Sequence, residues 1–461
     1  MKAIKIKIPK EVQGIMSELQ KRGFEAYVVG GCVRDILRGV AAQSKALSEP
    51  RLAEARREPE DWDIATNAKP EEIQSVFPNN FYANKFLTVT VQTGSKNPRL
   101  KEIEITTYRS EAKYTDKRHP DEVRFAKTLE EDLSRRDFTV NAIAIGQKGK
   151  NLEIIDLFGG QVDLKKKIIR AVGDPDTRFT EDALRLMRAV RQATTMGEGW
   201  QIEEKTFEAI KRNAKNIQAI SKERVRDEFL KMITSERASD GLELIRESGL
   251  LKYILPELDM AVGVTQNKHH IYDCYEHALL SLKFAAKKNF NKEVRIAALL
   301  HDIGKPRVKK GEGPDSTFYN HEIVGAKITK EILSRLKFPK KDIKKITKLV
   351  RYHLFYYNVD EVGESSVRRL VRQVGPENME ELLQVRQADR IGSGVPKAEP
   401  YKLRHLKYII DKVAQDPISV VMLKADGNDV MRILGIQPGP KVGQVLDVLL
   451  GYVLADPKNN E

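Results

Sequence analysis

Two aspartates that flank one tryptophan form the most informative feature of this chain. Asp61 and Asp63 stand in the segment Glu-Asp-Trp-Asp-Ile-Ala-Thr. Residues i and i+2 of an extended strand point to the same side, so such a strand would present both carboxylates together. Oxygen ligands of this kind suit Mg²⁺, and paired Mg²⁺ ions about 4 Å apart support in-line phosphoryl and nucleotidyl transfer. On its own, an Asp-x-Asp tripeptide is more often a solvated strand edge. The residues upstream favour the metal-binding interpretation instead.

A glycine pair and an arginine precede the aspartates. Gly30 and Gly31 end a short apolar strand where a helical pattern begins, and Arg34 lies one turn into that helix. A glycine turn at a helix N-terminus lets backbone N–H groups approach a triphosphate, whose charge the arginine would neutralise. This junction is common in α/β proteins, so it indicates phosphate binding only in combination with the aspartates.

A second basic segment, Arg-Arg-Asp-Phe-Thr-Val-Asn-Ala, spans residues 135–142. Its arginine pair, Arg135 and Arg136, can clamp phosphates bidentately. The alternative is a plain surface ion pair with Asp137. A third carboxylate, Glu104, lies on the strand expected over residues 103–107 and is a further candidate beside the aspartates.

A helical pattern over residues 180–191 carries an acidic residue and three regularly spaced arginines. Residues three apart on a helix are neighbours, so Asp182 and Arg185 are expected side by side. A carboxylate and a guanidinium can together read the edge of a base. Arg188 and Arg191 would extend a basic stripe towards phosphates. For an isolated helix, ion pairs on an amphipathic surface would explain the same spacing.

The second candidate site is a set of histidines and aspartates in the C-terminal half. The chain has only eight histidines, and four of them fall in one order with two aspartates. Neutral imidazoles with carboxylates suit Mn, Fe, Ni, Co or Zn better than Mg. Any single member is more often a core histidine, whereas the ordered set favours a metal centre. Its members are His277, His301, Asp302, His321, His353 and Asp389.

These segments together resemble the bacterial-type (class II) tRNA nucleotidyltransferase and poly(A) polymerase family. The resemblance rests on Gly-Gly-x-Val-Arg-Asp, Asp-Trp-Asp-Ile-Ala-Thr, Arg-Arg-Asp-Phe-Thr-x-Asn-Ala, Glu-Asp-x-x-Arg-x-x-Arg-x-x-Arg and Ser-Lys-Glu-Arg at 221–224, in this order. It implies that the 3′-hydroxyl of tRNA attacks the α-phosphate of CTP or ATP and pyrophosphate leaves. Asp61 and Asp63 would hold catalytic Mg²⁺. The implied nucleotide-binding residues are Gly30, Gly31, Arg34, Arg136, Asp182, Arg185, Arg188 and Arg191.

The histidine–aspartate set resembles an HD-domain metal-dependent phosphohydrolase. By that resemblance, His277, His301, Asp302 and Asp389 are its core ligands, and the other two histidines match two-metal members. The implied ion is a transition metal such as Mn²⁺, Ni²⁺, Fe²⁺ or Co²⁺, which would activate water against a phosphoester.

Two departures from the family pattern concern nucleotide positioning. Leu87 stands where relatives usually carry glycine, and residues 41–58 lengthen the connection to the metal strand. The segment 108–120 resembles the flexible loop associated with switching from C to A addition, which argues against an enzyme that adds only C.

Composition limits the remaining choices. The chain has 461 residues, a net charge of +14 and two cysteines, and it lacks an apolar run of the ~18 residues that span a bilayer. These features favour a cytoplasmic protein with a polyanionic partner and no membrane association. The predicted fold class is α+β multidomain, with an α/β nucleotidyltransferase head followed by helical parts. The predicted divisions are a head at 1–150, a helical neck at 151–260, an HD domain at 261–395 and a helical tail at 396–461.

The preferred function is template-independent addition or repair of the 3′-terminal CCA of tRNA, with tRNA, CTP and ATP as partners. The same head chemistry also fits an A-adding enzyme or a poly(A) polymerase, which the Asp182/Arg185 pair does not distinguish. A rival of a different class is an HD phosphohydrolase whose head only binds RNA. The intact Asp61/Asp63 pair argues against it, because a binding head has no need of both carboxylates.

Overall fold

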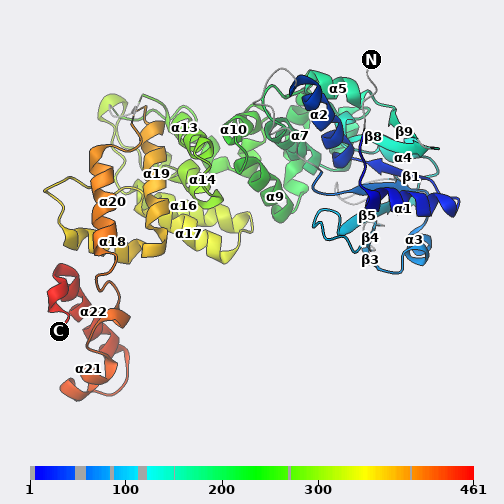
Figure 1. Ribbon diagram of the computed structural model, residues 1–461. Coiled ribbons are helices and arrows are strands. Elements are labelled where there is room, and N and C mark those ends of the chain that lie inside the picture. Colours follow the sequence, from blue (N-terminus) through cyan, green and yellow to red (C-terminus); the bar gives the residue numbers. More distant parts are fainter. Residues whose placement is uncertain are drawn as a thin grey trace. The chain divides into compact units, whose positions relative to one another are not determined.

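A computed structural model describes most of the chain, and contacts within it define two compact units (Figure 1). The first unit comprises residues 1–228 with 247–253, and the second comprises 229–246 with 254–461. The four-part division expected from the sequence remains a prediction. None of the described helices has the length and apolar content needed to cross a membrane. The described residues are 6–46, 59–83, 88–112, 122–149, 151–267, 271–394 and 397–461.

A mixed sheet forms the centre of the first unit. Its seven strands, as far as the described residues go, lie in the order β3-β4-β5-β2-β1-β8-β9. β2 runs parallel to β5, and the other neighbours are antiparallel. The strands are β1 (Ala26–Val29), β2 (Asp63–Thr66), β3 (Asn80–Ala83), β4 (Thr88–Gln92), β5 (Glu102–Thr107), β8 (Ile143–Lys148) and β9 (Asn151–Asp156).

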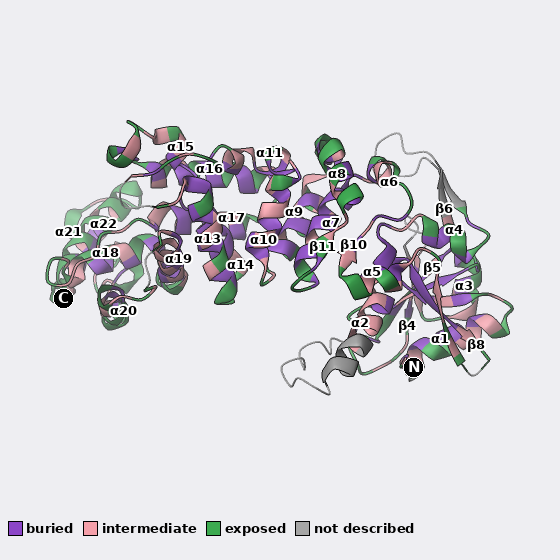
Figure 2. Ribbon diagram, turned by 90° about the horizontal axis from the view of Figure 1, so that it is seen from above, coloured by how far each residue is buried: buried purple, intermediate pink, exposed green. Residues whose placement is uncertain are grey.

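Alternation along the central strands supplies a core on each face of this sheet. Val28 and Ile64 belong to one buried cluster, and their chain neighbours Val29 and Ala65 belong to another. Successive side chains of a strand point to opposite faces, so both faces of β1 and β2 are covered. The buried strands are purple in Figure 2. Asp63 therefore opens a strand whose following residues are fixed by packing on both sides.

Helices and short pairs complete the first unit. They are α1 (Lys10–Lys21), α2 (Gly31–Ala46), α3 (Pro70–Val76), α4 (Leu129–Ser134), α5 (Gly160–Lys166), α6 (Pro175–Glu181), α7 (Leu184–Thr195) and α8 (Glu204–Asn213), with the 3₁₀ turns η3 (Thr139–Asn141) and η4 (Ala214–Ala219). β6 (Arg109–Ala112) pairs with β7 (Glu122–Phe125), and β10 (Ile168–Ile169) with β11 (Gln201–Ile202). Strands also occur in the neck expected from residue 151: β9 belongs to the head sheet, and β10 and β11 form a small pair. Leu87, residues 47–58 and residues 113–120 of the expected loop lie outside the described residues.

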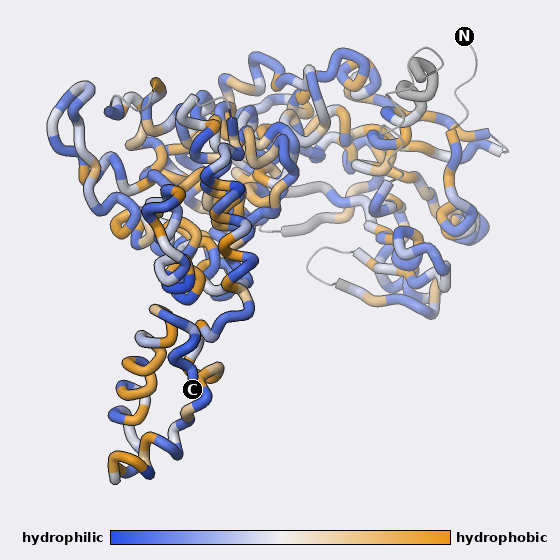
Figure 3. The backbone as a smooth tube through the Cα atoms, turned by 60° about the vertical axis from the view of Figure 1, so that its left-hand side comes forward, coloured by the Kyte–Doolittle hydropathy of each residue, from blue (hydrophilic) through white to orange (hydrophobic). Residues whose placement is uncertain are grey.

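The described part of the second unit is helical. Its helices are α10 (Ala238–Glu247), α12 (Pro256–Asp259), α13 (Cys274–Lys287), α14 (Lys292–Leu300), α15 (Lys305–Val308), α16 (His321–Arg335), α17 (Lys340–Tyr352), α18 (Glu364–Val374), α19 (Met379–Gly392), α20 (Tyr401–Val413), α21 (Gly427–Leu434) and α22 (Pro440–Ala455). α9 (Lys222–Ile233) and α11 (Leu251–Ile254) each contain a boundary between the units, and Glu247, the last residue of α10, belongs to the first unit. Hydrophobic residues recur along the segment near the C-terminus (Figure 3). The predicted α+β class, a mixed sheet followed by helices, is confirmed.

Candidate functional sites

The carboxylates of the head gather at the start of β2. Asp63 is the first residue of this strand and is in register with Glu104 of the parallel strand β5. Asp61 is exposed and lies two residues before the strand. The expectation that one strand carries both aspartates is therefore wrong in detail, because the strand begins only at Asp63.

Electrostatics show that these carboxylates influence one another. The pKa of Asp63 is raised to about 6, chiefly by burial; Arg136 lowers it, and Glu104 and Asp61 add to the rise. Burial and then Asp61 also raise the pKa of Glu104. Among the described residues, the oxygens of this trio do not all lie within 4.8 Å of one another. The concentrated negative charge fits a hard divalent cation, which would offset it.

The glycine turn brings a cation and a carboxylate to one point. Gly30 has φ +83°, and a Cβ built on it would lie 3.0 Å from Nη1 of Arg136 and 3.4 Å from Oδ2 of Asp63. A side chain at this position would meet both groups and would strain the backbone. The structure therefore joins three sequence-predicted residues from three separate motifs.

A buried aspartate that sequence reasoning missed holds the arginine pair. Asp132 lies 2.7 Å from Nη2 of Arg135 and 3.2 Å from Nη2 of Arg136. Burial by itself would raise the pKa of Asp132, but these guanidiniums lower it below its usual value. The alternative of an ion pair with Asp137 is wrong, since Asp137 contacts Arg188 instead. The i,i+3 and i,i+4 spacing from Asp132 is the signal that could have found it.

Arg34 folds back over the glycine turn. Its Nε and Nη2 donate to the carboxylate of Asp35, each at 2.9 Å, and its Nη1 donates to Oδ1 of Asn141 at 2.9 Å. A Cβ on Gly31 would lie 3.5 Å from Nη2 of Arg34. The guanidinium is thus fixed beside the N-terminus of α2, where an anion is favoured.

The expected helix over residues 180–191 is interrupted at Asp182. α6 ends at Glu181 and α7 begins at Leu184. Oδ1 of Asp182 accepts from the Leu184 N–H at 3.0 Å, a local bond that competes with a continuous helix. Oδ2 of Asp182 accepts from Arg224 at 3.1 Å. Arg185 is buried and donates to Glu181 at 2.7 Å, so the structure does not pair it with Asp182.

The two remaining arginines of α7 contact buried carboxylates. Arg188 donates to Asp137 through Nε at 2.8 Å and Nη2 at 2.6 Å, and Arg191 donates to Glu228. Burial would raise the pKa of Asp137, but Arg188 lowers it well below its usual range. The expected basic stripe is therefore neutralised by protein groups.

The six predicted metal ligands of the second unit converge. His277 lies on α13 and Asp389 on α19, while His321 is the first residue of α16. His301 and Asp302 follow α14 directly, and His353 follows α17. Five helices thus contribute ligands, from their ends or from within, and these ligands surround the carboxylate of Asp302.

Asp302 places one oxygen on each side of the cluster. Its Oδ2 lies 3.2 Å from Nε2 of His277 and 3.3 Å from Nε2 of His301. Its Oδ1 lies 3.3 Å from Nε2 of His321 and 3.6 Å from Nε2 of His353. This arrangement can bridge two cations.

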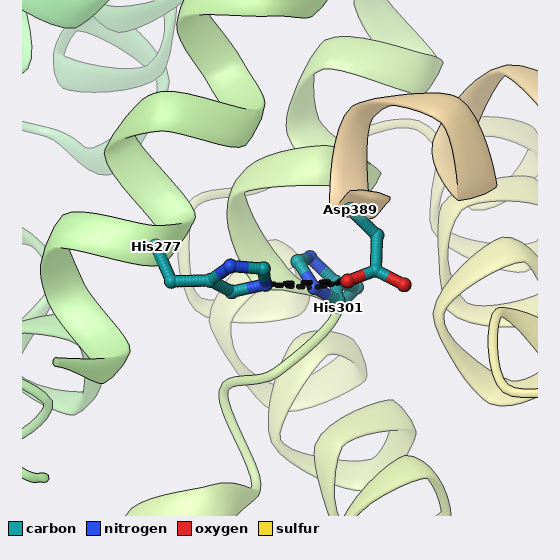
Figure 4. A group of neighbouring side chains, drawn as sticks. All are labelled: His277, His301 and Asp389. Carbon is teal, nitrogen blue, oxygen red and sulfur yellow. Dashed lines mark hydrogen bonds and ion pairs between the residues drawn. The ribbon is translucent and has the colours of Figure 1, made fainter. Parts of the chain in front are cut away.

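Asp389 completes the first side of the cluster (Figure 4). Its Oδ1 lies 3.4 Å from Nε2 of His277 and 3.6 Å from Nε2 of His301, and those two nitrogens are 2.8 Å apart. The other oxygen of Asp389 accepts from Arg386 at 2.8 Å. Lys305, buried 2.6 Å from Asp302, was not expected from the sequence.

Backbone carbonyls orient three of the imidazoles. Nδ1 of His301, His321 and His353 each lies 2.8 Å from the carbonyl oxygen three residues earlier. A proton on Nδ1 leaves the lone pair of Nε2 directed into the cluster, the usual second contact of a metal-bound histidine. Burial alone would raise the pKa values of Asp302 and Asp389, but neighbouring cations and imidazoles hold both well below the usual range. The donor set fits a transition metal.

Two glycines permit the close approach of the helices that carry these ligands. A Cβ on Gly304 would lie 2.3 Å from the carbonyl oxygen of His321. A Cβ on Gly392 would lie 2.2 Å from Oγ of Ser281 and 2.8 Å from the carbonyl oxygen of His277. Larger residues would separate the ligands.

Comparison with known proteins identifies related families for both parts of the chain. The family of the poly(A) polymerase head domain matches residues 26–170, the probable RNA- and SrmB-binding site of polymerase A matches 199–262, and the HD domain matches 271–393. A CCA-adding enzyme of Lactococcus lactis subsp. lactis is 34% identical over 99% of this chain and 96% of its own length. An A-adding tRNA nucleotidyltransferase of Deinococcus radiodurans is 35% identical over 70% of this chain and 74% of its own length.

A solved structure shows the same architecture. The crystal structure of Bacillus stearothermophilus CCA-adding enzyme in complex with CTP has a TM-score of 0.67 and 29% identity, and the match covers 97% of this chain and 94% of that one. Fold and site together define a nucleotidyltransferase, so the chain is an enzyme whose head is followed by an HD domain. The chain belongs to the bacterial-type tRNA nucleotidyltransferase family, whose members include the CCA-adding enzymes. The resemblance found in the motifs is confirmed.

Proposed function

We propose that this enzyme adds or repairs the 3′-terminal CCA of tRNA, using CTP and ATP. The observation that carries the proposal is that Arg136 and Asp63 both lie beside Gly30, at 3.0 Å and 3.4 Å from a Cβ built on it. A guanidinium that would bind phosphate and a carboxylate that would bind metal thus lie near one backbone position. The names of the relatives, CCA-adding enzymes among them, support the choice of tRNA and of the two nucleotides.

Each head residue has a role in this proposal. Asp61 and Asp63 would hold Mg²⁺, which when bound offsets the charge of the triphosphate and of the attacking oxygen. Gly30 and Gly31 leave room for the phosphates at the N-terminus of α2, and Arg34 and Arg136 neutralise them. The 3′-oxygen of tRNA forms a bond to the α-phosphorus as the bond to pyrophosphate breaks.

Base selection is assigned to Asp182 and Arg185, with Arg188 and Arg191 beside them. Asp182 contacts Arg224, and Arg185 contacts Glu181. Reading a base edge would require each of the pair to exchange its protein partner for the base. The hydrogen bonds of α7 to buried carboxylates would keep that helix in place during the exchange.

The decisive experiment uses a tRNA transcript that ends at the discriminator base. Purified enzyme with Mg²⁺ receives CTP alone, ATP alone, or both, and products are resolved at single-nucleotide length. Two additions with CTP and a third only with ATP are expected. Asp63→Asn, which keeps the side-chain volume but removes the charge, is expected to abolish extension while tRNA affinity is kept.

Other outcomes would identify the alternatives. A single A added only to CC-ended tRNA would indicate an A-adding enzyme, the activity named for the Deinococcus radiodurans relative. A long A ladder would indicate a poly(A) polymerase. No extension under any condition would favour an HD phosphohydrolase with an RNA-binding head.

A second activity is proposed for the other unit, as a metal-dependent phosphohydrolase. The two-sided contact of Asp302 with four imidazoles favours it. Mn²⁺, Ni²⁺, Fe²⁺ or Co²⁺ would be held there, and would supply an activated water when bound. Metal analysis and hydrolysis of p-nitrophenyl phosphate test this. Asp302→Asn is expected to lose both metal and hydrolysis without changing nucleotide addition.

A cytoplasmic location is part of the proposal. Both cysteines, Cys32 and Cys274, are buried free thiols. Burial raises the pKa of each thiol to about 12. Unpaired cysteines are typical of a reducing compartment, where the tRNA substrate is also found. Fractionation of cells that express the protein, followed by immunoblotting, tests this location.

A further inference from the structure

Asn141 connects three motifs of the head through one side-chain amide. It is 6% exposed and ends the 3₁₀ turn η3. Its Oδ1 accepts from Nη1 of Arg34 at 2.9 Å, and its Nδ2 donates to Oδ1 of Asp137 at 2.9 Å and to Oε1 of Gln192 at 3.2 Å. Both amide hydrogens and one lone pair are therefore used.

Charge fixes the orientation of this amide. A guanidinium only donates and a carboxylate only accepts, so the oxygen must face Arg34 and the nitrogen must face Asp137. The flipped amide would place donor against donor and acceptor against acceptor. Asn141 is therefore matched to two oppositely charged neighbours. A residue of its size that lacks either a donor or an acceptor could not form both bonds.

We propose that Asn141 is a positioning residue for nucleotide addition, which holds the Arg34 guanidinium for the triphosphate. This inference rests on the phosphate-binding role proposed for Arg34. Asp35 takes two N–H groups of Arg34 and Asn141 takes a third. A guanidinium has five N–H donors, so two remain for a phosphate. Because Asp35 and Asn141 hold the other three, they also fix the direction in which these two point.

The same amide ties the phosphate-binding residue to α7. Asp137 accepts from Arg188, and Gln192, one turn further along α7, accepts from Asn141. Asn141 thus connects α7, which begins beside the residues proposed to read the base, to Arg34, which is proposed to bind the triphosphate. A displacement of Arg34 by phosphate would be transmitted to α7 by this network.

The first test is a double-mutant cycle on nucleotide kinetics. Asn141→Ala is expected to raise the KM for CTP and for ATP about tenfold, the effect of losing one hydrogen bond to a charged group, with the KM for tRNA unchanged. In an Arg34→Ala background, the same change is expected to alter the nucleotide KM less than twofold. An equal factor in both backgrounds would overturn the proposal, because Asn141 would then act independently of Arg34.

A rescue experiment covers the case in which Asn141→Ala fails to fold. Asn141→Asp places a carboxylate against Asp137 and is expected to raise the nucleotide KM. Combining it with Asp137→Asn exchanges amide and carboxylate and restores a donor–acceptor pair between these two side chains. The Phe138 N–H, which donates to Oδ1 of Asp137 at 2.8 Å, would then face the new amide nitrogen. Gln192 can follow by turning its amide, because its Nε2 is buried without a partner. The exchanged protein is therefore expected to recover part of the loss, with a nucleotide KM below that of Asn141→Asp alone. A KM no lower than that of Asn141→Asp would overturn the proposal.

Failure of this inference differs from failure of the proposed function. Arg34→Ala alone is expected to raise the nucleotide KM. If it does not, the phosphate role of Arg34 is wrong and the inference falls with it. If Arg34→Ala raises the KM and Asn141→Ala does not, the proposed function stands and the positioning role is refuted.

Discussion

Replacing Gly30 by alanine tests the head site at its narrowest point. The residue has φ +83°, and its new Cβ would lie 3.0 Å from Arg136 and 3.4 Å from Asp63. A left-handed backbone costs a non-glycine residue about 1–2 kcal/mol. In addition, the methyl group would displace the guanidinium by a few tenths of an ångström. We therefore expect a modest loss of stability and a larger loss of activity.

Gly23 provides a matched control on the other side of β1. It has φ +84°, and nothing lies within 4 Å of a Cβ built on it. Gly23→Ala therefore carries the same backbone strain as Gly30→Ala without the contact. Both variants are expected to lose about 1–2 kcal/mol of the free energy of unfolding, so the difference between them isolates the contact with Arg136 and Asp63.

The assay is steady-state incorporation of CTP into a tRNA that lacks CCA, with urea unfolding measured in parallel. For Gly30→Ala, kcat/KM for CTP is expected to fall roughly 10- to 100-fold, since small misplacements of catalytic groups have effects of this size. For Gly23→Ala, a fall below about twofold is expected, because a folded variant with an intact site retains its activity. Equal losses in the two variants would show that Gly30 matters only for its backbone, and the reasoning about the site would be wrong.

Three further predictions concern stability, the metal cluster and pH. Arg295→Met should lower the free energy of unfolding by about 3 kcal/mol, because the buried guanidinium donates to the carbonyl oxygens of Ile233 and Ser235; urea unfolding measures this. Gly304→Ala should weaken metal binding at the HD cluster, since its Cβ would lie 2.3 Å from a backbone oxygen; metal titration against Gly363→Ala, where the space is open, checks it. The lowered pKa of Asp137 means that its carboxylate stabilises the fold above the unfolded value of 3.8 and loses this effect as pH falls towards the folded value. The difference in unfolding free energy between the unchanged protein and Asp137→Asn should therefore be constant from pH 7 to 5 and smaller at pH 3.

Residue type and spacing were sufficient to single out both candidate sites. The sequence predicted Asp63, Gly30 and the HD ligands because few structural needs, apart from a metal or nucleotide site, bring such residue types together in one order. The strand–turn–helix around Gly30 was also predictable, since apolar alternation and a glycine are local signals. The Asp-x-Asp pattern by itself did not show that β2 begins at Asp63 and leaves Asp61 outside the strand.

Side-chain partners were not predictable where they are distant in the sequence. An ion pair of Asp137 with its neighbouring arginine was the alternative that the sequence left open, but Asp137 pairs with Arg188, which lies 51 residues away. Asp182 was expected beside Arg185, but it contacts Arg224, which lies 42 residues away. Helical spacing predicts which side chains are neighbours within one helix. It does not predict a carboxylate or guanidinium from another element that lies nearer in the folded protein.

The sequence by itself determined which groups could do chemistry and in which class of enzyme: carboxylates, a glycine turn and arginines in the head, and imidazoles with aspartates behind it. Only the tertiary structure decided which of these groups meet. It placed Arg136 against Gly30 and Asp63, and it made Asn141 the link between Arg34 and α7. The physical reason is that a hydrogen bond or ion pair depends on distances of about 3 Å, and such distances between remote residues are set by the packing of the sheet and helices.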